Sequence, residues 1–434
     1  MKESIKKRIE AVRRGEVPEG YCRVHPYVIP NDWEVVKLEN ITKRTSRPNK
    51  DRKDRPAYSI NNRKGFVPQN EQFEEGSYED LDKSAYKIVR KGEFAYNPAR
   101  VNVGSIGRLR NAEEVAVSSL YVCVSVDDKV DGEYFDAWTK SLDFYKETVR
   151  NTEGSVREYL FYENFANMRM PIPSRAEQKK IAEILATCDR AIELKQQLLE
   201  EKRRQKQWLM QKLLVPNSGV RMPGFENTTW EKSTIASLFT FGSSMAKSRD
   251  ELSGEGDLYL HYGDIHANER YYIDAKAGYE AIPKYDGASP EKTHLHNGDV
   301  VFIDASEDYD GISKFVVIEN GDGLTFISGL HTIPCHSRDD RLTLHFKRYC
   351  FQTYQFKKQM AYYANGMKVY GISERDFAKV EVVFPGHEEQ VAISNVLDAI
   401  SMNIELLEKE IVEIGKKKKA LMQLLLTGLV RVKA

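Results

Sequence analysis

The stretch PSRAEQKKIAEILATCDRAIELKQQLLEEKRRQKQWLMQKLL, residues 173–214, occurs twice in this chain. The second copy lies 212 residues further on, at 385–426, and 15 of the 42 positions are identical without a gap. A repeat of this size indicates a duplicated structural unit, so it sets the frame for the rest of the chain.

Both copies are predicted to be long helices. Residues at intervals that alternate between four and three are mostly apolar, which is typical of a coiled-coil seam. At about 1.5 Å per residue each helix is expected to be roughly 60 Å long. The alternative is two ordinary amphipathic helices on separate domains, but two matched seams in one chain favour burial against each other. The seam positions are Ile181, Leu185, Cys188, Ile192, Lys195, Leu199, Lys202, Lys206, Leu209 and Leu213, with counterparts Ile393, Leu397, Ile400, Ile404, Leu407, Ile411, Ile414, Lys418, Leu421 and Leu425.

The repeated unit extends beyond the helix. The same offset holds backwards to Tyr134 and its counterpart Phe346, so the unit is a globular domain together with the helix that leaves it. Before Tyr134 the two halves diverge in length and composition, although the order of elements runs parallel. Residues 91–94 (KGEF), for example, echo residues 297–300 (NGDV).

The start of the chain resembles the segment that follows the first long helix. Trp33-Glu34 near the start matches Trp230-Glu231, as in a circularly permuted repeat. We therefore expect five segments, which are an N-terminal helix at 1–20, a first domain at 21–172, a central helix at 173–216, a second domain at 217–384 and a C-terminal helix at 385–427.

Composition narrows the class of protein. A chain of 434 residues is too long for one core, so two or three domains are expected. No run approaches the ~18 apolar residues of a membrane helix, and the charged N-terminus lacks the apolar core of a signal peptide. The five cysteines are odd in number and form no C-x-x-C, which favours a reducing, cytoplasmic location. Lys plus Arg equals Asp plus Glu at 65 each, so only local clustering can indicate nucleic acid.

Residues 43–64 form the sharpest basic cluster. Proline and asparagine within it predict a loop, and such a loop suits phosphate contacts and base edges in a major groove. A solvated surface loop is the alternative. The second half has a smaller basic stretch that includes Arg338, Arg341 and Lys347. The cations of the first cluster are Lys43, Arg44, Arg47, Lys50, Arg52, Lys53, Arg55, Arg63 and Lys64.

Searches for catalytic and metal motifs give no match. Asn97-Pro98 is followed by Ala99 and Arg100, so the aromatic of an adenine methyltransferase N-P-P-[FY] motif is missing. The acidic residues of the second half lack the lysine that a common metal nuclease places two positions beyond an acid, and we interpret them as an acidic loop. The histidines lack zinc spacing and are interpreted as surface or strand residues. We expect no catalytic residue and no metal ligand. The residues concerned are Asp299, Asp304, Glu307, Asp308, Asp310, His261, His266, His294 and His296.

These residues carry a resemblance to a known family. A repeated domain that ends in Pro-x-x-x-Glu-Gln-x-x-Ile and a helix that closes with Leu-Met-Gln-x-Leu-Leu resemble the specificity subunit of type I restriction–modification systems. The segments Phe94–Gly107 and Gly298–Asp308 are similar to phrases in the target-recognition domains of that family. The resemblance implies an α/β (α+β) chain with two target-recognition domains, separated by two long antiparallel coiled-coil helices in a pseudo-two-fold repeat.

The resemblance also implies partners. They are double-stranded DNA, two methyltransferase subunits and two restriction subunits, with S-adenosylmethionine, ATP and Mg in those subunits and no cofactor in this chain. Because the two variable regions differ, the target is expected to be bipartite and asymmetric. The alternatives are a coiled-coil scaffold without a DNA role, or the specificity subunit of a related methyltransferase-only system.

We expect DNA contacts from residues of both halves. We also expect Gln178 and Gln390, as shared exposed residues of the two repeats, to dock two copies of one partner. The DNA-contact candidates are Lys43, Arg44, Arg47, Arg52, Lys53, Arg55, Arg63, Asn97, Arg100, Arg338, Arg341 and Lys347.

Overall fold

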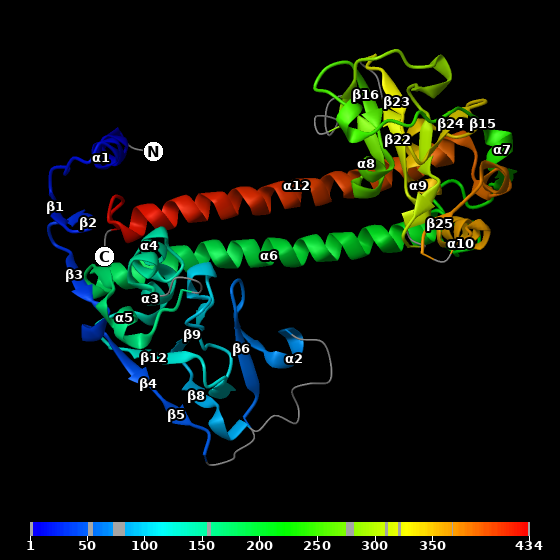
Figure 1. The fold of residues 1–434 in the computed structure, drawn as a ribbon. Coiled ribbons are helices and arrows are strands. Elements are labelled where there is room, and N and C mark those ends of the chain that lie inside the picture. Colours follow the sequence, from blue (N-terminus) through cyan, green and yellow to red (C-terminus); the bar gives the residue numbers. More distant parts are fainter. Residues whose placement is uncertain are drawn as a thin grey trace. The chain divides into compact units, whose positions relative to one another are not determined.

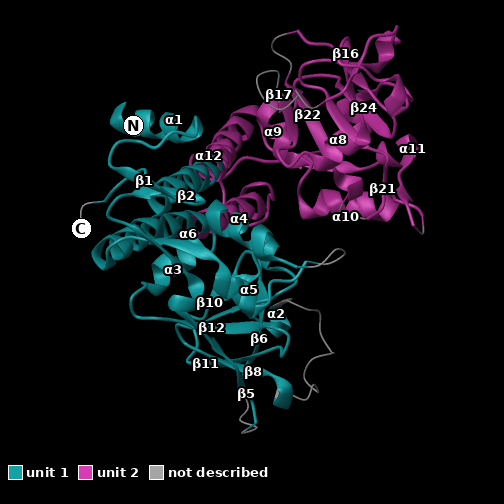
Figure 2. Ribbon diagram, turned by 60° about the vertical axis from the view of Figure 1, so that its left-hand side comes forward, with its two compact units in different colours: residues 1–196, 409–434 teal, residues 197–408 magenta. Residues whose placement is uncertain are grey.

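The chain divides into two compact units, shown in different colours in Figure 2. Unit 1 combines residues 1–196 with 409–434, and unit 2 is residues 197–408. The computed structural model describes residues 3–50, 55–72, 83–153, 158–274, 282–308, 311–319, 323–366 and 368–432.

Unit 1 holds an antiparallel four-stranded sheet, a mixed five-stranded sheet, a set of short helices, the beginning of the first long helix and the end of the second (Figure 1). Its elements are α1 (Glu3–Arg13), β1 (Tyr21–Val24), β2 (Tyr27–Pro30), β3 (Glu34–Lys37), β4 (Thr42–Thr45), β5 (Arg47–Pro48), β6 (Ala57–Asn61), β7 (Gly65–Pro68), α2 (Gln69–Gln72), β8 (Lys87–Arg90), β9 (Phe94–Tyr96), β10 (Ile106–Arg108), β11 (Glu114–Val117), β12 (Val122–Val126), α3 (Gly132–Trp138), α4 (Leu142–Asn151), α5 (Tyr162–Asn167), β13 (Arg169–Ile172) and the start of α6 (Arg175–Leu213).

Unit 2 has a similar order of elements, with extra short strands, and it also contains the end of α6. Its elements are β14 (Glu231–Thr234), α7 (Ile235–Leu238), β15 (Phe239–Phe241), β16 (Asp257–Leu260), α8 (Tyr262–Ala267), β17 (Tyr272–Asp274), β18 (Lys284–Tyr285), β19 (His294–Leu295), β20 (Val300–Ile303), β21 (Ala305–Ser306), β22 (Phe315–Glu319), β23 (Phe326–Ser328), β24 (Thr332–Ser337), α9 (Leu344–Cys350), α10 (Tyr354–Tyr363), β25 (Tyr370–Gly371), α11 (Glu374–Phe377), β26 (Glu381–Phe384) and the start of α12 (His387–Leu426).

The two units share one sheet topology. Strand order β10-β9-β12-β4 in unit 1 corresponds to β22-β20-β24-β15 within the larger sheet of unit 2. In the second sheet, β8-β11-β6-β7 corresponds to β19-β23-β16-β18. Both second sheets contain one parallel pair at the same place, β6 with β11 and β16 with β23. The duplication therefore covers the whole domain, including the part before Tyr134 where the sequences diverge.

The two long helices are confirmed. Ser174 caps α6, because its Oγ accepts a hydrogen bond of 3.3 Å from the backbone N–H of Glu177. The helix contains 39 residues, and α12 contains 40. Every seam position of both helices is buried or half-buried, which confirms the four–three pattern.

Ion pairs within each unit show that the helices run antiparallel. In unit 1 Lys195 Nζ lies 2.7 Å from Glu410 Oε2, and Lys418 pairs with Asp189. In unit 2 Arg203 Nη2 lies 2.7 Å from Glu408 Oε1. In unit 1 residue numbers fall along α12 as they rise along α6, which confirms the expected orientation.

Each unit's core takes in the start of one long helix and the end of the other. In unit 1 the aromatic cluster around Trp138 includes Ile181 from the start of α6 and Leu425 from the end of α12. In unit 2 the cluster around Phe302 includes Leu213 from the end of α6 and Ile393 from the start of α12. The sequence-based boundaries set the helices apart from the domains, whereas the structure divides each helix between the two units.

Candidate nucleic-acid interface and the shared helix starts

A buried glutamine closes the start of each long helix. Gln178 Oε1 accepts a hydrogen bond of 2.7 Å from the backbone N–H of Asp131, and its Nε2 donates to the carbonyl of Pro173 at 3.0 Å. Gln390 makes the same contacts 212 positions later, with Thr343 N at 2.8 Å and Pro385 O at 2.8 Å. The two arrangements are called the glutamine clasps below.

The clasps correct one prediction. Gln178 is 1% exposed and Gln390 is 0% exposed. Both side chains satisfy backbone groups of their own unit, because a buried amide that lacks a partner costs free energy. The prediction that they are exposed docking residues is therefore wrong, and they tie the residue before α3 or α9 to the start of the long helix.

A second shared feature lies one residue earlier. Glu177 pairs with Arg431 at 2.8 Å and accepts a hydrogen bond of 3.1 Å from Trp33 Nε1. The Arg431 guanidinium also lies 5.8 Å from the centre of the Trp33 ring and binds Asp32. These contacts join the last segment of unit 1 to its first strands.

Unit 2 repeats this arrangement, but its arginine and tryptophan lie in one continuous segment, residues 221–230. Glu389 pairs with Arg221 at 2.8 Å, and the Arg221 guanidinium lies 5.3 Å from the centre of the Trp230 ring. Arg221 follows α6 as Arg431 follows α12. The circularly permuted repeat suggested by Trp33 and Trp230 therefore has a structural counterpart within each unit.

Some of the predicted DNA-contact residues are used inside unit 1. Arg47 makes a bidentate pair with Glu93 at 2.7 and 2.8 Å, and the hydrogen bonds to Glu93 raise the pKa of Arg47. Arg55 is 8% exposed and binds Asn49 at 2.7 Å and Glu114 at 3.0 Å. The prediction that Arg55 faces DNA is wrong because of its burial, whereas Arg47 stays a candidate whose guanidinium is paired with an acid of its own unit.

Other predicted residues of unit 1 remain open to solvent. In the part of the chain that the structure describes, Lys43, Arg63 and Arg100 are exposed and their side chains form no ion pair or hydrogen bond. Arg44 is exposed and has a long pair of 3.4 Å with Glu163. Asn97 Oδ1 accepts from the backbone N–H of Ala99 at 3.0 Å, which fixes the turn after β9. Arg52 and Lys53 lie outside the described residues.

The unit 2 candidates are mostly committed to the fold. Lys347 is 5% exposed, and its Nζ donates to Gly298 O at 2.8 Å and Ser337 Oγ at 2.7 Å. Arg341 binds Asp339 and Glu231, both at 3.0 Å. Arg338 is exposed, but its Nε donates to the carbonyl of Phe239 at 2.9 Å. The prediction that Lys347 contacts DNA is wrong because of its burial.

A pocket in unit 1 brings together two cations of the basic cluster and three that no sequence pattern indicated. Its volume is about 300 Å³, and it lies between the loop after β6, the turn before β10 and the start of α4. Arg63 and Lys64 line it together with Arg108, Arg110 and Lys140. The last three residues are spread over the sequence and lie among acidic residues, so no local run of charge marked them. Arg110 binds Asp136 at 2.8 Å, and Arg110 and Lys140 overcome the effect of burial and lower the pKa of that carboxyl.

The fold defines a class of protein, one with two topologically equivalent domains that share a pair of antiparallel helices. A family model described as type I restriction modification DNA specificity domain matches residues 30–202. Over these residues the chain is similar to that family, and over almost its whole length it is similar to type I restriction enzyme specificity subunits, which supports the resemblance.

Individual relatives give the extent of this similarity. The specificity subunit of the type I restriction enzyme MjaVIII from Methanocaldococcus jannaschii is 24% identical over 432 residues, covering 96% of this chain and 97% of that protein. The crystal structure of the HsdS subunit from Thermoanaerobacter tengcongensis is 17% identical, with a TM-score of 0.52, and covers 94% of this chain and 99% of that one. A chain solved for the complex assembly and conformational transition of a type I R-M system is 15% identical, with a TM-score of 0.59, over 93% of this chain and 100% of that one.

Among the described residues, none of the helices is both long and apolar enough to cross a membrane.

Proposed function

We propose that this chain is the non-catalytic DNA-reading subunit of a type I complex, and that it reads a bipartite, asymmetric target. The observation that carries the proposal is the pair of domains with one topology and unlike variable regions. Two equivalent scaffolds suit two half-sites on a duplex, and different loops on them suit different base sequences. The complex acts in the cytoplasm.

In unit 1 the DNA-facing residues are the exposed cations. Arg63 and Lys64 at the pocket, with Lys43 and Arg100, are free to contact phosphates and base edges. The chain has no net charge, and counterion release scales with the number of phosphates neutralised. The isolated subunit therefore binds DNA weakly, and binding strengthens when partner subunits close around the duplex.

Two methyltransferase subunits and two restriction subunits dock on this chain. Leu194 and Leu406 occupy equivalent positions in the two repeats, and they are 53% and 55% exposed. A pair of exposed leucines, one on each long helix, offers the same apolar contact twice, which suits two copies of one partner. They replace Gln178 and Gln390 as docking candidates. S-adenosylmethionine, ATP and Mg bind to the partner subunits.

Methylome sequencing tests the proposal. Cells that carry this chain with its methyltransferase partner should show methylation at a bipartite motif, and the motif should disappear when the chain is deleted. An unchanged methylome would favour a scaffold without a DNA role. Restriction of an unmethylated plasmid by the same cells would separate a complete type I system from a methyltransferase-only system.

The spacer between the half-sites depends on the helices in this proposal. Removing seven residues from each helix shortens the helix by about 10 Å, at ~1.5 Å per residue. This length corresponds to roughly three base pairs of DNA at ~3.4 Å each. The methylated motif should shorten its unread spacer accordingly and keep both half-sites. A motif with the original spacer would contradict the role of the helices.

A further inference from the structure

Equivalent turns precede a central strand in each unit. In unit 1 the Glu93 N–H donates to Arg90 O at 2.9 Å, and the Arg90 N–H donates to Glu93 Oε2 at 2.9 Å. In unit 2 the Asp299 N–H donates to His296 O at 3.0 Å, and the His296 N–H donates to Asp299 Oδ2 at 2.6 Å. The glycine before each acid has the same φ of +88°. Each turn therefore places a carboxylate at the entrance of β9 or β20.

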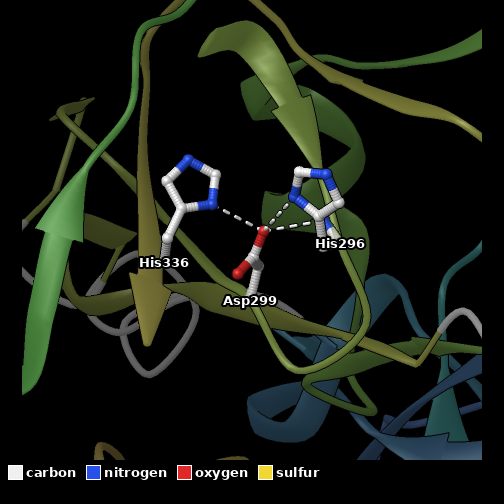
Figure 3. Close-up of side chains that lie close together, drawn as sticks. All are labelled: His296, Asp299 and His336. Atoms are coloured by element: carbon white, nitrogen blue, oxygen red, sulfur yellow. Dashed lines mark hydrogen bonds and ion pairs between the residues drawn. The ribbon is translucent and has the colours of Figure 1, made fainter. Parts of the chain in front are cut away.

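The two carboxylates are buried but have different partners. Glu93 is 8% exposed and Asp299 is 5% exposed, and a buried carboxylate is costly unless a positive charge compensates it. Arg47 supplies a permanent charge to Glu93. Among the described residues, the side chains paired with Asp299 are two imidazoles, His336 at 2.7 Å and His296 at 3.6 Å (Figure 3). Neither imidazole carries a permanent charge like that of Arg47.

We infer that His296, Asp299 and His336 bind a divalent transition-metal ion of the zinc type. The ligand atoms of the three residues lie within 4.8 Å of one another. Two ligands of a tetrahedral zinc ion stand roughly 3.3 Å apart, given metal–ligand distances of about 2.0–2.1 Å. The 3.6 Å between His296 Nδ1 and Asp299 Oδ2 is close to that value. The 2.7 Å hydrogen bond between His336 and Asp299 has to lose its proton and lengthen by about half an ångström to admit the ion.

The donor set decides the class of ion. Two imidazole nitrogens and one carboxylate oxygen suit zinc and its neighbours, whereas Mg²⁺ and Ca²⁺ prefer oxygen ligands alone. Three protein ligands leave a fourth position, which water takes. The His296 side chain is 71% exposed, so an ion can reach the group from solvent.

The surroundings hold the group in place. A Cβ at Gly242 would lie 2.6 Å from His336 Nε2, so only glycine at this position leaves room for the ring. The nearby cation Lys347 donates hydrogen bonds to Gly298 O and Ser337 Oγ, which stabilises the turn. The ammonium group of Lys347 is therefore bonded to these two oxygens and not to Asp299. An ion here would bond the turn before β20 to the neighbouring strand β24, and would stabilise unit 2 alone.

No local sequence pattern predicts this group. His296 is exposed, as the sequence predicts, and Asp299 lies in a loop as predicted but is buried there. The third ligand, His336, comes from a different strand, so the group has no local spacing pattern.

Metal titration of the full chain tests the inference. After treatment with a chelator, Zn²⁺ added during isothermal titration calorimetry should bind at one site per chain, and Co²⁺ should give the visible absorption of a four-coordinate complex. His296→Asn and His336→Asn should each weaken Zn²⁺ binding by at least tenfold. His331→Asn is the matched control, because His331 forms another exposed pair in unit 2, with Asp304 at 3.1 Å, and it should bind Zn²⁺ like the parent.

Amide exchange supplies the second measurement and checks folding. Zn²⁺ should slow exchange at residues 296–300 and at β24 in the parent chain, while the turn at residues 90–93 of unit 1 should not respond. Equal Zn²⁺ binding by the folded double variant would overturn the inference and point to the cysteines. Protection that changes with pH but not with Zn²⁺ would also overturn it, since the group would then be a protonated histidine–carboxylate pair only.

Discussion

The glutamine clasps give the sharpest test of how each domain is attached to its helix. Gln390→Ala removes the acceptor of the Thr343 N–H and the donor to Pro385 O, both at 2.8 Å, inside a site with no exposure. An unmet buried amide costs about 1–3 kcal/mol, and a second lost hydrogen bond adds about 0.5–1.5 kcal/mol. The substitution should therefore destabilise unit 2 by roughly 2–4 kcal/mol, and Gln178→Ala should do the same to unit 1.

Hydrogen exchange read by mass spectrometry can assign the loss to one unit. With about 1.4 kcal/mol for each factor of ten, exchange around Thr343 should speed up by roughly 30-fold to several hundred-fold in Gln390→Ala, and unit 1 should be unaffected. Gln196→Ala is the surface control, since Gln196 is exposed on α6. Unchanged protection at Thr343, together with loss of binding to a methyltransferase partner, would refute the reasoning and restore the docking role.

Three further outcomes are expected. Arg431→Ala should destabilise unit 1 by about 2 kcal/mol and so lower its urea midpoint, because Glu177 is then a buried charge whose remaining side-chain donor, among the described residues, is Trp33. Arg431→Lys should recover part of the loss, and an unchanged midpoint would show that the pairing is not stabilising. Arg63→Ala and Arg100→Ala should each weaken DNA binding by the assembled complex and reduce the salt slope by about one, without a change in folding, and equal binding at all salt concentrations would remove them from the interface. Burial raises the pKa of Cys123 to about 12, so thiol reagents at pH 8 should leave this thiol unmodified until the protein unfolds. The other buried cysteines should behave in the same way, and labelling of the folded protein should be confined to Cys22 and Cys188. Fast reaction of all five thiols would contradict the packing.

Much of the fold could be predicted from the sequence because repetition and periodicity are strong signals. The fixed offset located both long helices and their seams, since residues such as Ile181 and Ile393 must face the partner helix in either copy. The part before Tyr134 was harder. There the two halves share strand order but hardly any side chains, because a sheet needs only apolar alternation and tolerates many residues that satisfy it.

The candidate site could be predicted only in part. Arg63 and Arg100 are exposed as expected, but Arg47 and Arg55 lie in the same basic cluster and are tied to Glu93 and Glu114. A run of charge shows that cations are present, and it cannot show which of them meet an acid 46 or 59 positions away. The error at Gln178 has the same origin, since a polar residue shared by two repeats can serve the interior as well as a partner.

The division of the chain has a consequence for its synthesis on the ribosome. Unit 2 is contained in residues 197–408, so all of its contacts become available as soon as that length has emerged. Unit 1 needs residues 409–434 as well, including the hydrogen bond of 2.7 Å from Tyr21 Oη to Gly428 O and the pairs made by Arg431. Unit 1, whose larger part is translated before unit 2, is therefore completed after it, because its fold requires residues 409–434.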